Sequence, residues 1–297
     1  MDVTSPRIAT TRAELAALLA SRRTAGQKVG LVPTMGALHD GHASLMQVAR
    51  ASIEDGPLVA SIFVNPLQFG AGEDLDRYPR TLEADLKVCE REGVDIVFAP
   101  GVDEVYPGGE PVVTIEAGPV AEILEGSSRP GHFRGVLTVV AKLFGLVRPD
   151  VAVFGQKDYQ QLVLIGRMAA DLCLGVDVVG AETEREPDGL AMSSRNRYLE
   201  EEQRFEAVAL NRTLRAAQEA APYGLDAAMR AARAELRSAP GVDLDYLKIT
   251  TPELGALSEN PEPGTEARIL IAARIGTTRL IDNLALTIGS APTERNR

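Results

Sequence analysis

The sequence predicts an α/β protein, with a doubly wound parallel sheet followed by a smaller α+β domain. Up to about residue 183, short apolar runs of strand length alternate with stretches of helical spacing, a pattern typical of a parallel sheet covered by helices on both faces. Beyond that point the chain changes to Ala-rich helical stretches and then to strands joined by a short turn. We therefore expect a Rossmann-like domain over residues 1–183 and an α+β domain over residues 184–297.

The elements of the first domain follow from the spacing of their apolar residues. Short apolar runs predict buried strands, and longer amphipathic stretches predict the helices that connect them. Since ligands of doubly wound sheets bind at the carboxyl ends of the strands, the segments that follow the strands are the candidate sites. In chain order we expect a helix over 11–21, a strand over 29–32, a helix from about 41 to 52, a strand over 58–64, a helix over 81–92, a strand over 95–99, a helix over 136–147, a strand over 151–154, a helix over 160–172 and a strand over 176–180.

The second domain is predicted from a different pattern. Residues 200–221 and 225–238 are Ala-rich and amphipathic, which predicts two helices. Strands are expected over 244–250, 268–275 and 279–286, and a Gly276-Thr277-Thr278 turn joins the last two. Helices followed by a hairpin of this kind indicate a small α+β domain.

Composition and charge exclude several classes of function. A net charge of −11 argues against a nucleic-acid partner, which needs a basic surface. No apolar run approaches the roughly 20 residues that cross a membrane, so no membrane partner is expected. The N-terminal residues lack the apolar core of a signal peptide, which predicts a cytoplasmic protein. Cys89 and Cys173 both lie in helical, partly apolar stretches, and we expect two buried thiols rather than a disulfide.

Two of the three histidines of the chain, His39 and His42, lie in one glycine-containing segment that follows a predicted strand. The helix that begins there offers the positive end of its dipole and unpaired main-chain N–H groups, which favour an anion. Two imidazole rings would add side-chain donors to phosphate oxygens. The alternative is a pair of capping or core histidines. The paired spacing and the glycines favour the anion site.

A protein of this charge needs local cations if it binds phosphate. Scattered surface cations are the ordinary expectation, but several cations here lie beside the unusual segments. They are Arg129, Arg134, Lys157, Arg195 and Arg197.

Three further polar segments follow strands or lie at the domain junction. Asn65 and Gln68 offer uncharged donors and acceptors suited to hydroxyl or carboxylate groups, although Asn and Pro also form ordinary turns. In the segment 154–161, Gly155 allows a ligand to approach the main chain and Lys157 places a charge at a strand end, whereas Asp158 is explained as a helix cap. Hydroxyls and a guanidinium in the segment 189–197 suit a polyphosphate, although alone they describe only a polar linker.

Together these segments resemble the pantothenate synthetase (pantoate–β-alanine ligase) family over nearly the whole chain. The resemblance is carried by residues 33–42, 63–69, 154–161 and 192–196. The HxGH-type signature of the first segment alone indicates only the wider nucleotidyltransferase superfamily. The resemblance implies a nucleotide- and pantoate-binding first domain, a C-terminal lid domain and a homodimer. It also implies a two-step reaction, in which pantoate and ATP give pantoyl adenylate and pyrophosphate, and β-alanine then gives pantothenate and AMP.

The resemblance also implies roles for individual residues. The catalytic residues would be His42, in the place of a proton donor, together with His39, Lys157 and Arg195. Gln68 and Gln161 would bind pantoate, with Gln68 beside the β-alanine position and Asn65 supporting that substrate pocket. Mg²⁺ is expected on the ATP phosphates, and the sequence names no metal ligand. The residues implied to bind ATP are Met35, Gly36, Ala37, Leu38, His39, Asp40, Gly41, His42, Gly155, Gln156, Lys157, Asp158, Glu184, Met192, Ser193, Ser194 and Arg195.

Several positions leave a choice open. Gln156 often has a glutamate counterpart in the family, and Glu184 stands where a small apolar residue near the adenine is common. If the adenine contact is made by the main chain, Glu184 is tolerated. His132 matches a family segment but is equally explained as structural. Residues 71–80 would form a mobile wall over the pocket. The competing functions are a nucleotidyltransferase that leaves the nucleotide on its product and a non-catalytic ATP-binding regulator.

Overall fold

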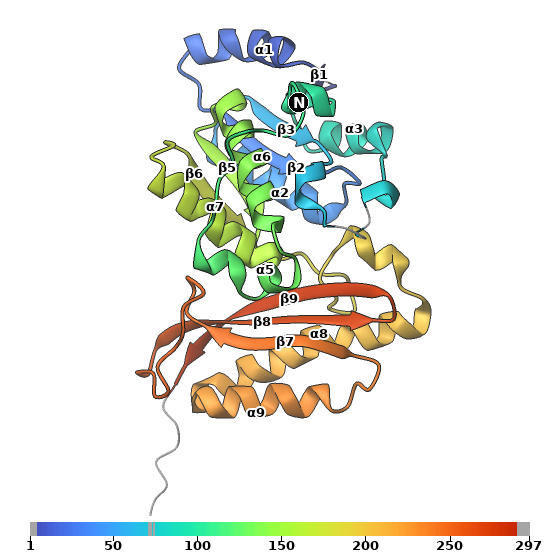
Figure 1. Cartoon of the computed structure of the whole chain (residues 1–297), viewed down its shortest axis with the longest axis vertical. Coiled ribbons are helices and arrows are strands. Elements are labelled where there is room, and N and C mark those ends of the chain that lie inside the picture. Colours follow the sequence, from blue (N-terminus) through green and yellow to red (C-terminus); the bar gives the residue numbers. More distant parts are fainter. Residues whose placement is uncertain (1–4, 71–72, 74, 290–297) are drawn as a thin grey trace, which may run out of the picture. The chain divides into compact units, whose positions relative to one another are not determined.

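The computed structural model describes residues 5–70, 73 and 75–289 and divides them into two units (Figure 1). The N-terminal unit comprises the described residues up to Gln156 together with Gln160–Glu182. The C-terminal unit comprises the rest, including Lys157–Tyr159. The short segment that follows the fifth strand therefore groups with the C-terminal unit, although its neighbours on both sides do not.

The N-terminal unit is built on a six-stranded sheet in the order β1-β4-β3-β2-β5-β6, and all its neighbouring strands run parallel. The strand order reverses between β2 and β5, because the chain proceeds from β2 towards one edge and from β5 towards the other. The strands are β1 (Arg7–Ala9), β2 (Gly30–Thr34), β3 (Leu58–Ile62), β4 (Ile96–Phe98), β5 (Val151–Gly155) and β6 (Asp177–Ala181).

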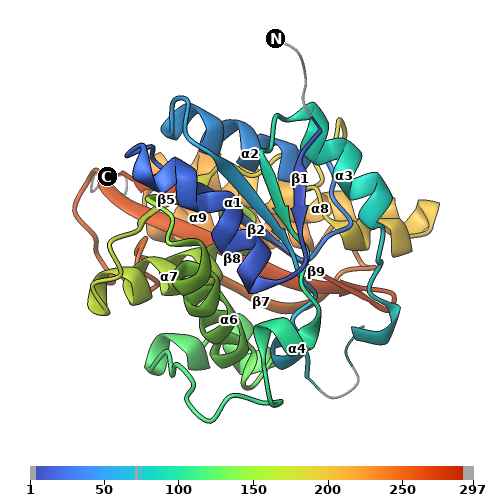
Figure 2. The same ribbon diagram turned by 90° about the horizontal axis from the view of Figure 1, so that it is seen from above.

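Helices cover both faces of this sheet (Figure 2). Alternate strand residues face opposite sides, so Leu31 joins the core beneath α1, α6 and α7, whereas Val32 joins the core beneath α2 and α3. The predicted doubly wound parallel fold is confirmed. The helices are α1 (Arg12–Thr24), α2 (Asp40–Ser52), α3 (Leu82–Arg91), α4 (Val102–Val105), α5 (Glu125–Ser128), α6 (His132–Val147) and α7 (Tyr159–Asp171).

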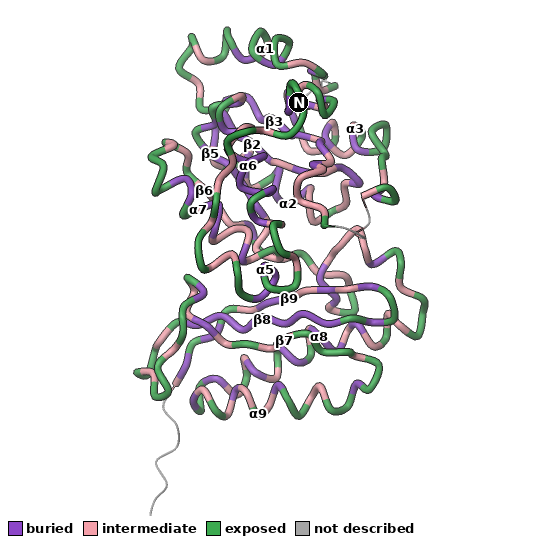
Figure 3. The backbone as a smooth tube through the Cα atoms, in the orientation of Figure 1, coloured by how far each residue is buried: buried purple, intermediate pink, exposed green. Residues whose placement is uncertain are grey.

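The C-terminal unit packs two helices with a three-stranded antiparallel sheet of order β7-β8-β9. Helix α8 contacts α9, β8 and β9, and Figure 3 shows the nearly continuous burial of β8. Strands β8 and β9 are joined by the two residues Gly276 and Thr277, and Gly276 has the positive φ of 58° that such a hairpin turn requires. This agrees with the predicted hairpin. The elements are α8 (Glu201–Ala220), α9 (Leu225–Leu236), β7 (Asp243–Thr250), β8 (Thr265–Ile275) and β9 (Thr278–Ile288).

The two cysteines differ from what the sequence predicts. Cys89 is buried on α3, and burial, followed by the charge of Asp85, raises the pKa of its thiol to about 12. Cys173 is exposed, which corrects the prediction of a buried thiol. Helix α7 ends at Asp171, and Cys173 lies in the turn beyond it with a φ of 52°, outside the apolar face of the helix. Both cysteines are free.

None of the described helices is long and apolar enough to cross a membrane.

Helix α6 packs against the main chain that follows β3, and this contact depends on a residue without a side chain. A Cβ atom on Gly135 would lie 2.1 Å from the carbonyl oxygen of Leu67, a separation that forces the main chain to move. A Cβ atom on Gly145 of the same helix would meet no atom within 4 Å. The two glycines therefore form a matched pair.

We expect Gly135→Ala to destabilise the protein by about 1–3 kcal/mol, because the overpacked backbone contact outweighs the better helix propensity of alanine. Gly145→Ala should stabilise it by up to about 1 kcal/mol. Urea-induced unfolding measures both free energies. Equal effects of the two substitutions would show that α6 does not depend on close approach at Gly135.

Candidate functional site

Three of the sequence-predicted segments follow adjacent strands of the parallel sheet. Strand β2 lies between β3 and β5, with Thr34 paired to Ile62 and Gly30 paired to Val151. The segments 35–42, 65–68 and 155–156 therefore begin at the same edge of the sheet, around the point where the strand order reverses. Open α/β sheets bind ligands in the crevice at this point. The sheet topology brings the predicted residues of the N-terminal unit to one edge.

The loop after β2 is held by a buried carboxylate that sequence reasoning missed. Asp85 of α3 is 2% exposed and accepts hydrogen bonds from the N–H groups of Ala37 and Leu38 at 3.1 and 2.8 Å. Gly36 and Ala37 both have positive φ, 86° and 51°, which turns successive N–H groups towards one anion. Thr81 donates its hydroxyl to Asp85 as well, at 3.1 Å. The anion bound by this loop is a side chain of the protein.

The two histidines cap the helix that follows. His39 is the N-cap of α2 and its Nδ1 accepts from the N–H of Gly41 at 3.1 Å, while Nδ1 of His42 accepts from the N–H of His39 at 3.3 Å. The ring centroids lie 4.2 Å apart. Because Nδ1 is an acceptor in both rings, the neutral form of each ring carries its proton on Nε2. The capping contacts thus make Nε2–H the donor of each histidine.

The expectation of unpaired main-chain N–H groups in this segment is corrected at four positions by these contacts. The N–H groups of Ala37 and Leu38 donate to Asp85, and those of His39 and Gly41 donate to imidazole nitrogens. The first turn of a helix requires partners for its N–H groups, and here the histidine rings supply them for His39 and Gly41. Asp40 is exposed and pairs with Arg91 at 3.0 Å.

Asn65 and Gln68 lie together after β3. Asn65 directly precedes the 3-10 turn Pro66–Gln68, and Gln68 is the last residue of that turn. Asn65 is 1% exposed, and its amide nitrogen donates to Oε1 of Gln68 and to the carbonyl of Gly135, both at 3.1 Å. Its Oδ1 accepts from the hydroxyl of Tyr106 at 2.8 Å and from the N–H of Leu67 at 3.3 Å. All four hydrogen-bonding positions of the Asn65 amide are thus used within the protein. Asn65 orients Gln68 and has no remaining position for a ligand.

Gln68 is partly buried and its amide nitrogen contacts the sulfur of Met35 at 2.8 Å, which links the segments after β2 and β3. Burial raises the pKa of the Tyr106 hydroxyl, so this group remains the donor to Asn65. The predicted substrate residue Gln68 is therefore fixed at its side chain by Asn65 and Met35.

The main chain of Gln68 is fixed by His132 and Arg129. Its carbonyl oxygen accepts from Nδ1 of His132 at 2.8 Å and from Arg129 at 3.4 Å. Since Arg129 only donates, its 3.1 Å contact makes Nε2 of His132 an acceptor. Arg129 also forms a bidentate pair with Glu73, at 2.7 and 2.6 Å. These contacts give His132 a structural role beside the predicted site.

The charge of Glu73 is held by the same arginine. Burial raises the pKa of Glu73, but hydrogen bonds and charge from Arg129 outweigh this effect and lower the pKa below its ordinary value. Glu73 belongs to the predicted wall over 71–80, of which residues 71, 72 and 74 lie outside the described part of the chain.

Two adjacent glutamines at the start of α7, Gln160 and Gln161, differ in their surroundings. Gln160 is 3% exposed, donates to the carbonyls of Val120 and Ile123 at 2.7 and 2.8 Å, and accepts from the N–H of Glu125 at 3.0 Å. Gln161 is partly buried and makes no hydrogen bond to any residue that the structure describes. Its amide is therefore available to a ligand.

Gln156 has a local role. Its amide nitrogen donates to the carbonyl of Gly180 on β6 at 3.1 Å, next to Gly155 at the end of β5. This contact ties the segment to the neighbouring strand.

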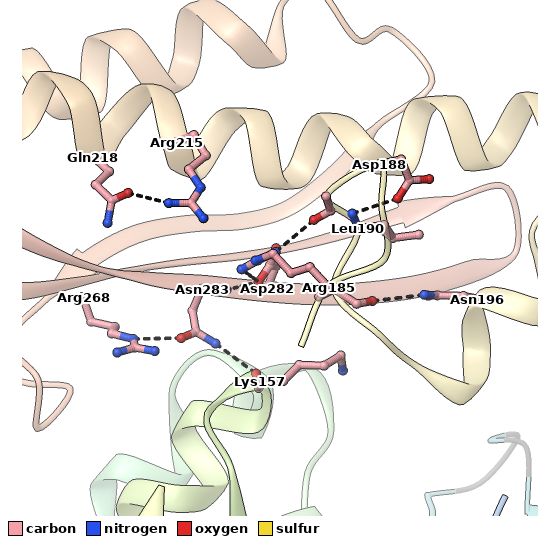
Figure 4. Close-up of polar contacts among 12 residues, drawn as sticks. Lys157, Arg185, Asp188, Leu190, Asn196, Arg215, Gln218, Arg268, Asp282 and Asn283 are labelled. Carbon is pink, nitrogen blue, oxygen red and sulfur yellow. Dashed lines mark hydrogen bonds and ion pairs between the residues drawn. The ribbon is translucent and has the colours of Figure 1, made fainter. Parts of the chain in front are cut away.

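In the C-terminal unit, Lys157 and Asp158 lie in the 3-10 turn Gln156–Asp158, which is anchored by β9 (Figure 4). The carbonyl oxygen of Lys157 accepts from the amide nitrogen of Asn283 at 3.0 Å. The ammonium group of Lys157 makes no ion pair within the described ranges. Asp158 is exposed. The turn therefore carries the ammonium group of Lys157, and the buried side chain of Asn283 holds its main chain.

The residues from 184 to 192 form a small hairpin. Arg185 and Ala191 make an antiparallel bridge, and the carbonyl of Glu184 accepts from the N–H of Met192 at 2.9 Å. The side chain of Glu184 is exposed. Arg185 donates both terminal nitrogens to Asp282, at 2.7 and 2.9 Å, and the Asp282 side chain is 3% exposed. The hairpin is thus attached to β9 beside Asn283 (Figure 4).

The predicted phosphate-binding hydroxyls follow this hairpin directly. Ser193 caps the 3-10 turn Ser194–Tyr198 by accepting from the N–H of Arg195 at 3.3 Å. Asn196 is 8% exposed and donates to Glu186 at 2.7 Å and to the carbonyl of Ala191 at 3.0 Å. The segment is therefore an ordered turn.

Sequence reasoning missed three buried polar residues: Asp85, Asp282 and Asn283. Their partners are distant in the sequence, so spacing within a motif gives no sign of them. The adjacent pair Asp282 and Asn283 carries one signal, because two polar residues interrupt a strand that is otherwise largely apolar. No group of three or more His, Cys, Asp or Glu side chains able to hold a metal ion occurs among the described residues.

Comparisons with known proteins agree on one family. The family model for pantoate-beta-alanine ligase matches residues 7–285. The pantothenate synthetase of a Nocardioides species is 70% identical over 96% of this chain and 87% of that protein. The pantothenate synthetase of Mycolicibacterium smegmatis is 53% identical over 94% of this chain and 87% of that protein.

Two solved structures are similar over nearly their whole length. The pantothenate synthetase of Thermus thermophilus has a TM-score of 0.86 and 50% identity, covering 94% of this chain and 98% of that one. The pantoate-beta-alanine ligase of Francisella tularensis, complexed with beta-gamma ATP and beta-alanine, has a TM-score of 0.75 and 35% identity, covering 94% and 97%.

The loop after β2 should depend on the charge of Asp85. In Asp85→Asn an amide N–H₂ must face one of the donors, so we expect a loss of about 1–3 kcal/mol in the free energy of unfolding. Hydrogen exchange of the Ala37 and Leu38 amides should accelerate. The matched control is Asp171→Asn, at an exposed aspartate, which should change stability by less than about 0.5 kcal/mol. If both variants unfold like the parent protein, Asp85 does not hold the loop.

Proposed function

Because the chain belongs to the pantoate–β-alanine ligase family, we propose that it joins pantoate to β-alanine at the expense of ATP. The family match over nearly the whole chain carries this proposal. It is also supported by the Francisella tularensis relative, whose structure contains beta-gamma ATP and beta-alanine. The substrates are therefore ATP, pantoate and β-alanine.

The reaction has two steps. A carboxylate oxygen of pantoate attacks the α-phosphorus of ATP, the bond from that phosphorus to the bridging oxygen breaks, and pyrophosphate leaves. The product is pantoyl adenylate. The neutral amine of β-alanine then attacks the acyl carbon, the bond to the AMP oxygen breaks, and the amine loses a proton. Adenylation is needed because a carboxylate has no good leaving group. No side chain needs to become covalently bound, since positioning and electrostatics supply the catalysis.

In the N-terminal unit, the histidine rings would act as donors to the phosphates. The capping contacts put the proton of each neutral ring on Nε2, so His39 and His42 would donate Nε2–H to oxygens whose charge rises in the transition state. Gln68 and Gln161 would bind pantoate through their amides. Asn65, whose amide is fully used, would support this pocket. The remaining N-terminal contacts to ATP would come from residues 35–41 and from Gly155 and Gln156.

In the C-terminal unit, Lys157, Ser193, Ser194 and Arg195 would bind the β- and γ-phosphates and the departing pyrophosphate. We propose that residues 184–297 act as a lid domain on a nucleotide- and pantoate-binding domain over residues 1–183. Glu184 uses its carbonyl within the hairpin and exposes its side chain. Glu184 and Met192, which this hydrogen bond joins, would lie near the adenine.

Mg²⁺ would enter with the ATP phosphates as part of the substrate. The described residues offer no cluster of ligands for it, and Mg²⁺ bound to substrate phosphates keeps several waters. Two further features complete the proposal, a homodimer, as the resemblance implies, and a cytoplasmic location, which the two free thiols support.

The substrates that each product requires for its release test the function. We expect pyrophosphate release from ATP to require pantoate, and AMP release to require both pantoate and β-alanine. A coupled pyrophosphate assay and chromatography of AMP measure the two products. A stable nucleotidylated product would identify a nucleotidyltransferase, and ATP binding without turnover would identify a regulator.

The two roles of His42 can be separated by substitution. Asn in place of His42 keeps an acceptor near the position of Nδ1 but has no group at Nε2, whereas Gln reaches the Nε2 position with an N–H donor. We expect His42→Asn to keep stability within about 1 kcal/mol, since the cap survives. Its rate of pyrophosphate release should fall about 10²–10³-fold, as on loss of a donor to a developing oxyanion.

His42→Gln should recover part of that rate, and urea unfolding of both variants controls for the fold. A His42→Asn variant that is less stable to urea but keeps its specific activity under native conditions would make His42 a capping residue only.

A further inference from the structure

We propose that Asn283 is a positioning residue for Lys157: a buried amide on β9 fixes the main chain of the turn that carries the phosphate-binding ammonium group. The inference rests on the proposed function for the role of Lys157. Asn283 itself lies on the antiparallel sheet and would touch no substrate. It would act through the carbonyl oxygen of Lys157, to which it donates at 3.0 Å.

The amide of Asn283 has only one orientation that satisfies its partners. Its Oδ1 accepts from Nε of Arg268 at 2.8 Å, and a guanidinium can only donate. The amide nitrogen must therefore face the carbonyl of Lys157. Asn283 is 2% exposed and Arg268 is 8% exposed, so both groups lie where an unpaired polar atom is costly. The strand thus specifies one position for that carbonyl.

The same arginine contacts the residue that follows the turn. The guanidinium carbon of Arg268 lies 4.0 Å from the ring centroid of Tyr159, two residues after Lys157. In the register of β8 and β9, Leu270 pairs with Asn283 and Arg268 with Ala285, so Arg268 and Asn283 are diagonal neighbours on one face. Figure 4 shows Asn283 directed towards Lys157 and Arg268. Two adjacent strands therefore hold the chain at Lys157, within the turn, and at Tyr159, directly after it.

The buried contact of Arg268 with Asn283 is better explained by positioning of the Lys157 main chain than by a gain in protein stability. Burial of an amide and a guanidinium costs desolvation, and apolar residues of similar volume often serve a core as well or better. What the polar pair adds is a fixed geometry for a main-chain atom. The ammonium group of Lys157 ends a flexible four-carbon side chain, so it depends on its main chain for its position.

Strand β9 also anchors the second proposed phosphate-binding segment, through Asp282, the residue directly before Asn283. Asp282 binds Arg185 of the hairpin that leads into Ser193, and the N–H of Asn283 donates to the same carboxylate at 2.8 Å. Adjacent residues of β9 therefore hold the turn of Lys157 and the hairpin before Ser193. A shift of either side chain would disturb the distance between the two segments.

The decisive substitution is Asn283→Asp, which keeps the size of the side chain and the acceptor for Arg268 but replaces the donor to Lys157 with an oxygen. We expect the rate of pantoate-dependent pyrophosphate release to fall about 10- to 100-fold, the range for a displaced catalytic group. The KM for pantoate should change less than twofold, because the pantoate residues are held by other contacts. Asn283→Ser, which shortens the side chain, serves if Asn283→Asp does not fold.

Two controls separate positioning from general destabilisation. Ile271→Val removes one methylene group from a fully buried residue of β8 and should leave the rate within about twofold. The second control is a double-mutant cycle with Lys157→Ala. Without the ammonium group there is nothing to position, so Asn283→Asp should add no further loss of rate in that background.

The outcomes are distinguishable. If the parent protein releases no pyrophosphate with pantoate, the proposed function fails. If it does, but Asn283→Asp behaves like Ile271→Val, or its effect adds fully to that of Lys157→Ala, the inference on Asn283 is wrong and the function stands. If Asn283→Asp lowers the rate in the parent protein but not in the Lys157→Ala background, Asn283 acts by positioning Lys157.

Discussion

The candidate site depends on one constraint: polar main-chain groups that no helix or strand pairs must find buried partners. The loops after β2, β3 and β5 leave the sheet at the same edge and lose their ladder hydrogen bonds there. Three side chains that are 1–2% exposed replace those bonds, namely Asp85, Asn65 and Asn283. A buried polar group left unpaired costs about 1–3 kcal/mol, so each of these contacts fixes its loop. The main chains of these loops are therefore held by buried side chains.

This constraint explains why capping and phosphate binding are compatible roles for His39 and His42. An imidazole has two nitrogens, and in the neutral ring one donates while the other accepts. The helix start uses Nδ1 of both rings as an acceptor, which leaves the proton on Nε2. The structural role of each ring therefore selects the tautomer that the proposed chemistry needs. A histidine fixed at one nitrogen is also oriented at the other, as second contacts orient the histidines of metal sites.

Much of the fold was predictable because its pattern is local. Apolar runs of strand length and helical periodicity located the longer elements within a few residues, including the hairpin at Gly276. Strand β1 has only three residues, too few for periodicity, and Cys173 lies just past a helix end that its neighbours did not mark. The segments of the site were predictable because glycines, histidines and amides cluster within ten residues or fewer. Their supports were not, since Asp85 contacts Leu38 across 47 positions and Asn283 contacts Lys157 across 126.

Two of the cations that the sequence predicts as phosphate-binding candidates, Arg129 and Lys157, differ in their partners. Arg129 forms a bidentate pair with Glu73 and donates to His132, so its charge is neutralised and its planar fork holds the main chain of Gln68. Arg185, which the sequence did not single out, is used in the same way on Asp282. Guanidinium groups suit this work, because their donors have fixed directions. Lys157 has no such partner among the described residues, although its main chain is held as firmly. In a protein of charge −11, such an ammonium group on a fixed turn is the kind of local cation that the proposed binding of a polyphosphate needs.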